Sequence, residues 1–302
     1  MSAADGVLLA DWGTTNLRAW RLDRVGKVAA RADFALGVAR LTPGEAAARF
    51  ESEVRPALAA QDLPALLCGM IGSTLGWTLA PYVDCPASLE SLAEGLSSPA
   101  PGVRIVPGLR GPGLIGPDVM RGEETQILGW LAADPARLSG VHTLCLPGTH
   151  AKWVRVEEGR LIRFVTAMTG ELYDLLGAQS VLRFAGPPGP IDLVAFDAGV
   201  AAAADGGALA ARLFGLRGLT LNGGLAAEAA PSWLSGLLIG AEIAALQPGF
   251  ATRTGAAVHL IGATRLCGLY ARALAAKDVS CEIADGEEAV LAGLTRIWSA
   301  IA

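Results

Sequence analysis

The stretch ADWGTTNLRAWRL, residues 10–22, places an acid, a glycine, two threonines and an asparagine between two apolar runs. Both runs have the composition of β-strands, and the polar residues between them favour a tight turn. Glycine lets the backbone approach a ligand closely, while turn amides and threonine hydroxyls supply several hydrogen-bond donors aimed at one point. The stretch therefore predicts a β-hairpin whose tip, residues 13–16, cradles phosphate.

Asp11 ends the first predicted strand, directly before this tip. A carboxylate repels phosphate unless a cation lies between them, and Mg²⁺ in proteins usually bridges phosphates to one or two carboxylates. Asp11 is therefore predicted to bind Mg²⁺. The alternative is an ordinary surface hairpin built from turn-forming residues.

The same pattern occurs a second time in TLCLPGTHAKWVRV, residues 143–156. Gly148 and Thr149 again stand between two strand-like runs, so two similar hairpins predict two related halves that face one site. Lys152 is expected either to neutralise phosphate charge or to face solvent. His150 is expected either to touch substrate or phosphate, or to support the turn.

The composition limits the class of protein. The chain has 302 residues, 52% of them hydrophobic, which is enough for two domains with their own cores. A net charge of −5 argues against general binding of nucleic acid.

The five cysteines are scattered without a CxxC pair, as expected of reduced thiols. The N-terminus lacks a signal-peptide pattern, and the longest apolar stretch, 233–246, is shorter than a membrane span. A cytoplasmic protein without a membrane partner is predicted.

Strand and helix patterns are distributed along the whole chain. Strands are predicted at residues 7–11, 17–22, 65–69, 103–109, 142–146, 153–156, 161–165 and 257–261. Helices are predicted at residues 44–58, 124–131, 171–183, 231–246, 265–276 and 287–297. Proline and glycine predict loops at residues 97–102, 111–118 and 186–190. The last two helices follow strand-like runs, which is typical of βα units.

These motifs carry a family resemblance. Residues 11–16 and 147–153 resemble the two phosphate motifs of the superfamily of sugar kinases, actin and Hsp70, and residues 259–270, HLIGATRLCGLY, resemble its adenosine motif. More narrowly, the chain resembles the 2-dehydro-3-deoxygalactonokinase family from about residue 7 to its end. The strings that carry this likeness are DWGTTNLRAW (11–20), GMIGSTLGW (69–77), VMRGEETQILG (119–129), LPGTHAKWV (146–154), TAMTGELYDLL (166–176) and SGLLIGAEIA (235–244).

The resemblance implies a two-domain α/β protein with the actin-like ATPase (ribonuclease H-like) fold, in which mixed sheets are flanked by helices and the active site lies in the interdomain cleft. It implies an N-terminal domain at residues 1–140 and a C-terminal domain at 141–302. It also implies ATP and Mg²⁺ as cofactors. The implied phosphate contacts are Gly13, Thr14, Thr15, Asn16, Gly148, Thr149 and Lys152, and the implied adenine contacts are Gly262, Ala263 and Thr264. Pro147 stands where the superfamily often has an acid, which leaves Asp11 as the predicted metal ligand.

Phosphoryl transfer to an alcohol needs a group that takes the hydroxyl proton. MRGEETQ, residues 120–126, offers Glu123 and Glu124 between the two hairpins. Two acids at the start of a helix also suit the helix dipole. In the related exopolyphosphatase branch a similar Gly/Glu/Glu element carries a catalytic acid, which favours Glu124 as the base here. Glu123 is the close alternative, because adjacent helical residues point about 100° apart and only one can reach the nucleophile.

The acceptor implied by the resemblance is a 2-keto-3-deoxy aldonate, phosphorylated on its terminal hydroxyl. Its carboxylate calls for cationic donors, and a guanidinium grips a carboxylate through two parallel hydrogen bonds. Arg18 and Arg121 are candidates, although either can be a surface or structural arginine. The GMIGST turn, residues 69–74, suits close approach of a polyol, or is an ordinary strand-to-helix turn. The predicted substrate contacts are Arg18, Met70, Gly72, Ser73, Arg121 and His150.

Three other functions are weighed against this kinase. Residues 111–116 match GxGxxG, but Pro112 and Pro117 remove amides that a dinucleotide site needs. A phosphohydrolase of the exopolyphosphatase type is supported by the RGEE element, although the chain lacks the charge for a basic channel. A nucleotide-binding repressor has little support, since no helix-turn-helix segment precedes Asp11. The sequence leaves open the galacto or gluco epimer and the oligomeric state, with a homodimer among the alternatives.

Overall fold

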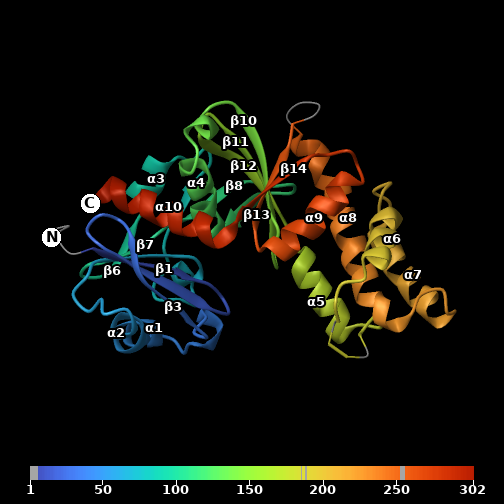
Figure 1. Cartoon of the computed structure of the whole chain (residues 1–302), viewed down its shortest axis with the longest axis horizontal. Helices are drawn as coiled ribbons and strands as arrows, with labels where there is room; N and C mark the ends of the chain where they lie inside the picture. Colours follow the sequence, from blue (N-terminus) through green and yellow to red (C-terminus); the bar gives the residue numbers. More distant parts are fainter. Residues whose placement is uncertain (1–5, 185, 188, 252–255) are drawn as a thin grey trace. The chain divides into compact units, whose positions relative to one another are not determined.

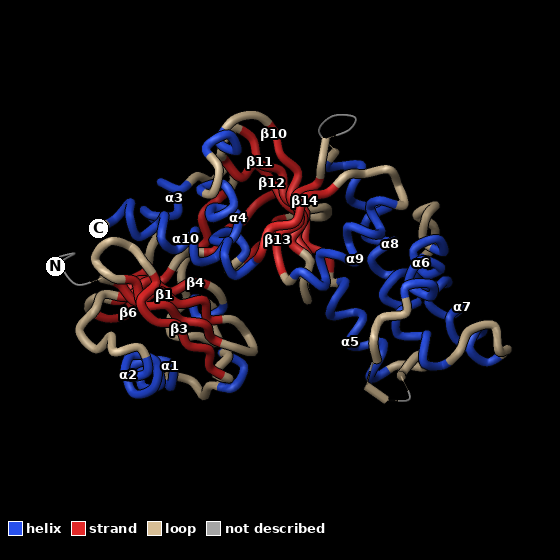
Figure 2. The backbone as a smooth tube through the Cα atoms, viewed as in Figure 1, coloured by secondary structure: helices blue, strands red, loops and turns tan. Residues whose placement is uncertain are grey.

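The computed structural model describes residues 6–184, 186–187, 189–251 and 256–302, and it divides into two compact units. The N-terminal unit comprises Met1–Val141, Val156–Phe164 and Ala284–Ala302. The C-terminal unit comprises His142–Arg155 and Val165–Ile283. Each unit contains a β-sheet with helices packed beside it (Figures 1 and 2).

The N-terminal sheet has six strands in the order β3-β2-β1-β4-β7-β6. Its bounds are β1 (Val7–Trp12), β2 (Leu17–Leu22), β3 (Val28–Phe34), β4 (Ala65–Cys68), β6 (Ser97–Ala100) and β7 (Val103–Ile105). The first three strands are antiparallel, while β4 is parallel to β1. β1 is apolar almost throughout because, as a central strand, it is covered on both faces. The register places Asp11 opposite Arg18 on β2 and Cys68 on β4.

The N-terminal unit also holds a small sheet and its helices. The sheet has the order β5-β8-β9, with β5 at Tyr82–Asp84, β8 at Gly108–Pro112 and β9 at Pro117–Met120. The helices are α1 (Glu45–Arg49), which continues through a π-helical turn (Phe50–Val54) into α2 (Arg55–Ala57), then α3 (Leu89–Glu94), α4 (Glu123–Ala132) and α10 (Gly286–Ile301). The core of this unit forms where Trp12, Phe50 and Ile71 pack between the sheet and α1–α2.

The C-terminal sheet repeats the strand order of the first, as β12-β11-β10-β13-β14. Its strands are β10 (Val141–Leu146), β11 (Ala151–Glu157), β12 (Arg160–Ala167), β13 (Val258–Gly262) and β14 (Cys281–Asp285), and β13 is parallel to β10. Its helices are α5 (Thr169–Gln179), α6 (Leu193–Ala202), α7 (Leu209–Leu221), α8 (Ala230–Phe250) and α9 (Thr264–Ala275). In both sheets a Gly-Thr hairpin therefore joins the central strand to its antiparallel neighbour, as the sequence repeat predicts.

Some predicted elements differ from the structure. The strand predicted at 103–109 is interrupted at Val106 and Pro107, because proline cannot donate to a strand ladder, and it becomes β7 and β8 in different sheets. The loop predicted at 97–102 is wrong in part, since Ser97–Ala100 forms the edge strand β6, where Pro99 is tolerated. Most of the loop predicted at 111–118 belongs to the β8–β9 hairpin. Residues 185 and 188 lie outside the described residues, and 188 falls within the loop predicted at 186–190.

The central helix of the C-terminal unit is longer than the apolar stretch in the sequence suggests. Helical residues Ala227–Phe250 would suffice by length and composition to cross a membrane, but 78% of the apolar window is buried inside the protein. The helix packs against α6 and α7 and carries core residues such as Leu234, Leu237 and Ile243. Burial on all sides explains why it is apolar around its whole circumference.

A close contact with α10 holds α4, the helix that begins with the two candidate glutamates. A Cβ added at Gly129 of α4 would lie 1.7 Å from the backbone oxygen of Ala289 in α10. The two helix backbones therefore touch directly at this position. We expect Gly129→Ala to lower the free energy of unfolding by about 1 to 3 kcal/mol, because the helices must move apart.

Urea denaturation, followed for the unit that carries each substitution, measures this effect. Gly268→Ala in α9 is the matched control, because among the described residues nothing beyond its chain neighbours and its own helix backbone lies within 4 Å of the added Cβ. It should leave stability unchanged or raise it by about 0.5 to 1 kcal/mol, as glycine is a weak helix former. Equal stability of Gly129→Ala and the unmodified protein would show that the helices are not in this contact.

Candidate active site

The tip of the first hairpin is exposed, and backbone hydrogen bonds from residues 38 and 39 fix its conformation. The amide of Gly13 donates to the oxygen of Asn16 at 2.9 Å and closes the turn. The amides of Val38 and Ala39 donate to the oxygens of Gly13 and Thr14 at 3.0 and 3.1 Å. These bonds leave the side chains of Thr14, Thr15 and Asn16 exposed to solvent. The tip is thus a fixed platform with free hydroxyl and amide groups.

Asp11 lies at the base of this tip with its carboxylate 24% exposed. Arg18 Nη1 is 4.0 Å from Asp11 Oδ2, and Cys68 Sγ is 3.9 Å from Oδ1. Burial raises the pKa of Asp11 to about 6, the positive charge of Arg18 opposes that rise, and the charge of Glu123 adds to it. Both named contacts of this carboxylate are long, so its oxygens can bind a cation.

Two glycine-containing turns meet beside Asp11. Gly69 has φ +87° and Gly122 has φ +111°, which are left-handed conformations that favour glycine. A Cβ on Gly122 would lie 3.3 Å from Gly69 Cα, and a Cβ on Gly69 would lie 3.2 Å from Asp11 Oδ1. The space around the Asp11 carboxylate therefore depends on the absence of side chains at these positions.

Glu123 and Glu124 begin α4 in different environments. Glu124 is fully buried, and its Oε2 accepts a hydrogen bond from the amide of Gly122 at 2.6 Å while Oε1 accepts one from Thr125 Oγ1 at 3.0 Å. Burial, followed by the charge of Glu123, raises the pKa of Glu124 to about 7. Glu123 is half-buried, and its Oε2 accepts from the amide of Arg121 at 3.2 Å. Adjacent positions on the helix thus give one enclosed carboxyl and one accessible carboxylate.

The two arginines proposed as substrate contacts differ in exposure: Arg18 is partly exposed, whereas Arg121 is buried. The side chain of Arg18 is 41% exposed and borders a polar cavity of about 410 Å³. Arg121 is buried: its Nη2 donates to the oxygen of Ala80 at 2.8 Å, and its guanidinium lies 4.5 Å from the centre of the Tyr82 ring. Among the described residues its Nε and Nη1 have no hydrogen-bond partner although both are buried, and Nη1 would be 2.8 Å from a Cβ on Gly72. Met70 and Ser73 flank this buried contact and are partly exposed.

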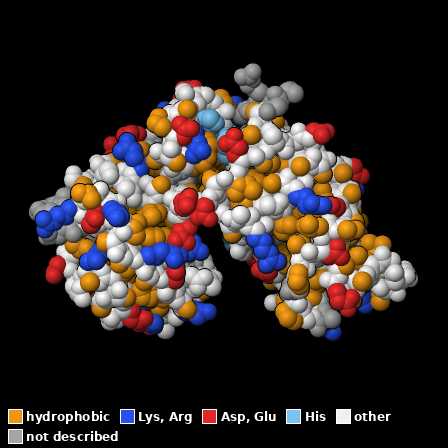
Figure 3. All heavy atoms as spheres, viewed as in Figure 1, with side chains coloured by type: hydrophobic (Ala, Val, Ile, Leu, Met, Phe, Trp, Pro, Cys, Tyr) orange, Lys and Arg blue, Asp and Glu red, His pale blue; other side chains and the backbone are white. Residues whose placement is uncertain are grey.

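The polar cavity beside Arg18 includes residues that sequence analysis missed. It is lined by Asn16, Arg18, Arg31, Asp33, Phe34, Ala35 and Glu287. Arg31 on β3 contacts Glu287 on α10, with Nε 2.7 Å from Oε1. Basic and acidic side chains lie next to one another over the strands of this unit in Figure 3. The Arg31–Glu287 pair joins residues too distant in the chain for any local pattern to connect them.

The tip of the second hairpin is held by α5. The amide of Glu171 donates to the oxygen of Thr149 at 3.0 Å, and a Cβ on Gly170 would lie 2.6 Å from the oxygen of Gly148. The ring of His150 contacts the carboxylate of Glu171. Lys152 is buried, not solvent-facing, and its Nζ donates to the oxygen of His150 at 2.7 Å. Both the imidazole and the ammonium therefore support the turn.

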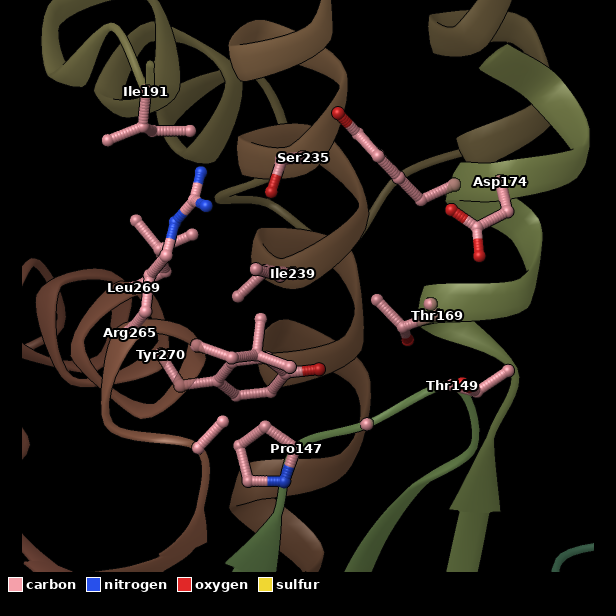
Figure 4. Close-up of a pocket in the computed structure, with 15 residues that line it drawn as sticks. Pro147, Thr149, Thr169, Asp174, Ile191, Ser235, Ile239, Arg265, Leu269 and Tyr270 are labelled. Carbon is pink, nitrogen blue, oxygen red and sulfur yellow. The ribbon is translucent and has the colours of Figure 1, made fainter. Parts of the chain in front are cut away.

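A cavity of about 520 Å³ opens beside this tip. In Figure 4, Pro147 and Tyr270 lie at one end, Thr149, Thr169 and Asp174 lie along one side, and Arg265 and Ile191 lie along the other. Of the three adenine contacts proposed from sequence, Ala263 lines the cavity, whereas Gly262 and Thr264 are its chain neighbours and do not belong to the lining. The lining residues that the sequence did not single out are Thr169, Gly170, Tyr173, Asp174, Ile191, Ser235, Ile239, Arg265, Leu266, Leu269 and Tyr270. All of them except Ile191 lie within the motif strings at 166–176, 235–244 and 259–270.

The repeated strand order, with a Gly-Thr hairpin in each sheet, defines an α/β protein of the actin-like ATPase class, to which sugar kinases belong. The fold is shared with the activator of 2-hydroxyisocaproyl-CoA dehydratase from Clostridium difficile, solved with bound ADPNP, at a TM-score of 0.54 and 12% identity over 98% of this chain and 95% of that one. Within this class the chain belongs to the 2-keto-3-deoxy-galactonokinase family, whose model matches residues 11–297.

Two relatives are similar to this chain over nearly its full length. The 2-dehydro-3-deoxygalactonokinase of Escherichia coli (strain K12) is 36% identical over 292 residues, which cover 97% of each chain. The crystal structure of a protein assigned as a 2-dehydro-3-deoxygalactonokinase from Sinorhizobium meliloti is 36% identical, with a TM-score of 0.84 over 98% of this chain and 99% of that one. The family resemblance and the fold expected from the sequence motifs are confirmed.

Proposed function

We propose that the protein is an ATP-dependent kinase that phosphorylates the 6-hydroxyl of 2-dehydro-3-deoxy-D-galactonate. Membership of the family, with full-length similarity to the Escherichia coli kinase, is the observation that carries this proposal. The acidic cluster of Asp11, Glu123 and Glu124 beside an exposed Gly-Thr tip supports it, because phosphoryl transfer needs phosphate donors, a cation and a proton acceptor close together. The substrate is a small sugar acid, and we propose that the reaction takes place in the cytoplasm.

ATP is proposed to bind through elements of each unit. In the N-terminal unit, Gly13, Thr14, Thr15 and Asn16 offer amide, hydroxyl and carboxamide donors to phosphate. In the C-terminal unit, Gly148 and Thr149 do so, and Lys152 adds positive charge behind the tip. The apolar side chains of Ile191, Ile239 and Leu266 suit the adenine ring, which proteins usually hold by apolar packing.

Asp11 fits a role as the protein ligand of Mg²⁺. Its carboxylate is partly exposed, has a raised pKa and lies beside a tip suited to phosphate. Among the described residues no group of three or more His, Cys, Asp or Glu side chains is arranged to hold a metal by itself. This suits Mg²⁺, which is usually held by one or two carboxylates together with substrate phosphates and neutralises charge on the transferring group.

We expect Asp11→Asn to raise the Mg²⁺ concentration needed for half-maximal activity by about tenfold or more, because a neutral amide is a weaker ligand for a hard cation. A Mg²⁺ titration of the initial rate at saturating ATP measures this. Asp62→Asn is the matched control, since Asp62 is exposed between α2 and β4 of the same unit. An unchanged Mg²⁺ titration for Asp11→Asn would show that Asp11 is not a ligand of the metal.

The acceptor is proposed to bind near the acidic cluster. Arg18 is the stronger candidate for the substrate carboxylate, because it is half-exposed and its ion pair with Asp11 is long. Arg121 is already packed on Tyr82 and Ala80, so its proposed role is to hold the 69–74 turn from which Met70 and Ser73 reach the polyol. Gly72 is buried in that turn, with its amide and oxygen bonded to Gly69 and Ala80, so its proposed role is to keep the turn close to Arg121. A further contact from His150 remains a proposal, since its ring already contacts Glu171.

The hydroxyl proton is proposed to pass to Glu124. A carboxyl with a pKa near 7 accepts a proton more readily than an ordinary surface glutamate at neutral pH. Because Glu124 is closed off in this structure, acceptor binding must open a path past Glu123 and Gly122, which are partly exposed. Contacts at catalytic groups commonly form fully only in the complex with substrate.

Steady-state ADP release with each epimer of the sugar acid tests the substrate assignment. The galacto epimer is expected to give the higher kcat/KM, and ADP release is expected to be negligible without a sugar acid. A higher kcat/KM for the gluco epimer would mean that the gluco epimer, not the galacto epimer, is the substrate. Rapid phosphate release in the absence of acceptor would favour the phosphohydrolase instead.

A further inference from the structure

A buried carboxylate lies against the floor of the cavity in the C-terminal unit, and the proposed mechanism does not use it. Glu242 on α8 is 6% exposed and accepts hydrogen bonds from three side chains. Trp153 Nε1 donates to Oε1 at 2.7 Å, Tyr270 OH donates to Oε2 at 2.7 Å, and Thr169 Oγ1 also donates to Oε2. Burial raises the pKa of Glu242, and the three donated hydrogen bonds oppose that rise.

While Glu242 is ionised, this arrangement fixes the direction of each hydrogen bond, because a carboxylate can only accept. An indole nitrogen can only donate, whereas a hydroxyl can donate one bond and accept others. Thr169 and Tyr270 both give their single hydroxyl proton to Oε2 of Glu242. Their oxygens can therefore offer only lone pairs to a molecule in the cavity that both residues line.

Thr169 lies between the two ends of that cavity. It is the first residue of α5, and the next two residues contact the hairpin tip at Gly148 and Thr149, where phosphate is proposed to bind. Ile191 and Leu269 line the apolar part of the cavity away from the tip, as Figure 4 shows. In a nucleotide, the ribose joins the phosphates to the base, and its hydroxyls are hydrogen-bond donors.

We propose that Glu242 is a positioning residue that makes Thr169 and Tyr270 hydrogen-bond acceptors, and that these acceptors select the ribose hydroxyls of the bound nucleotide. The inference rests on the proposed function, because it assumes that ATP occupies this cavity. It predicts a preference for ribonucleotides over deoxynucleotides that depends on a residue beneath the cavity.

Glu242→Gln tests the inference with almost no change in shape. Because the indole of Trp153 can only donate, the amide oxygen of the glutamine must face Trp153. The NH₂ group then faces Thr169 and Tyr270, whose hydroxyls must accept from it and turn their own protons elsewhere. The substitution therefore changes the oxygens that face the ribose from acceptors to donors.

Calorimetric titration with ATP, 2′-deoxy-ATP and 3′-deoxy-ATP measures the effect. For the unmodified protein, loss of the hydroxyl that contacts the acceptors should weaken binding by about tenfold, the value of one good hydrogen bond. In Glu242→Gln this discrimination should disappear, chiefly through weaker binding of ATP. Glu228→Gln, an exposed site in the same unit, is the matched control and should keep the discrimination.

A second pair of variants makes the test independent of Glu242. Thr169→Ser keeps the hydroxyl and should keep the discrimination, whereas Thr169→Val removes the hydroxyl and should reduce it. Equal discrimination in Glu242→Gln, Thr169→Val and the unmodified protein would overturn the inference, as would equal binding of all three nucleotides by the unmodified protein. Failure of the unmodified protein to bind ATP at all would instead contradict the proposed function.

Discussion

Glu124→Gln is expected to lower kcat by roughly 10² to 10⁴-fold, the usual contribution of a positioned general base. The amide has nearly the shape of the carboxyl group but cannot take the hydroxyl proton. Its oxygen can still accept from the amide of Gly122, and its NH₂ can donate to Thr125 Oγ1, which reverses its own hydrogen bond. The loss should therefore come from chemistry, with KM for ATP little changed.

Glu123→Gln is the paired variant for this measurement. Glu123 is half-buried and contributes to the raised pKa of Glu124, so its neutralisation should lower that pKa and reduce kcat much less. Steady-state rates for both variants at saturating ATP and acceptor decide between the two residues. A larger loss in Glu123→Gln than in Glu124→Gln would make Glu123 the general base. Near-normal turnover in both variants would show that neither glutamate takes the hydroxyl proton.

Glu124→Gln should also stabilise the ligand-free protein at alkaline pH. The pKa of Glu124 is about 7 in the folded state against 4.5 for an ordinary glutamate, so folding favours the protonated form. Its contribution to stability is fully present below pH 4.5 and is lost as the pH rises through 7. Glutamine resembles the protonated form at every pH, so the variant should be more stable than the unmodified protein by about 3 kcal/mol at pH 8 and by only about 1 kcal/mol at pH 5.

Urea denaturation at pH 5 to 8, followed on the N-terminal unit, measures this difference. Glu94→Gln, at an exposed position of α3, is the control and should show no such trend. A stability difference between Glu124→Gln and the unmodified protein that stays constant with pH would mean that the buried carboxyl has an ordinary pKa. The combination of lost activity and gained stability is expected where a charged group is buried for function.

Much of the N-terminal site could be predicted because its signals are local. The Gly-Thr tip, Asp11 and Arg18 lie within one hairpin, and the antiparallel register places Asp11 and Arg18 opposite each other. Two adjacent glutamates after a glycine likewise predict the start of a helix with different environments for the two side chains. The burial of Glu124 was not predictable, since it depends on how α4 packs against α10.

The cavity in the C-terminal unit was predicted in part: Gly148, Thr149 and Ala263 line it as expected, but the other lining residues were not singled out because they look like core residues. Ile239 and Leu269 stand in helices rich in alanine and leucine, where an apolar side chain gives no sign of facing a ligand. Glu242 was visible only as an acid in an apolar stretch, and its partners come from β11, α5 and α9. The helices α6 and α7 also went unpredicted, since their alanine- and glycine-rich sequences lack a clear period.

The fate of the γ-phosphoryl group tests the central claim most directly. ³¹P NMR of a reaction containing Mg²⁺, ATP and 2-dehydro-3-deoxy-D-galactonate follows ATP, ADP, inorganic phosphate and the sugar phosphate together. We predict one 6-phosphate formed for each ADP, with no turnover when the sugar acid is left out. Accumulation of inorganic phosphate in place of the 6-phosphate, with or without the sugar acid, would contradict the account.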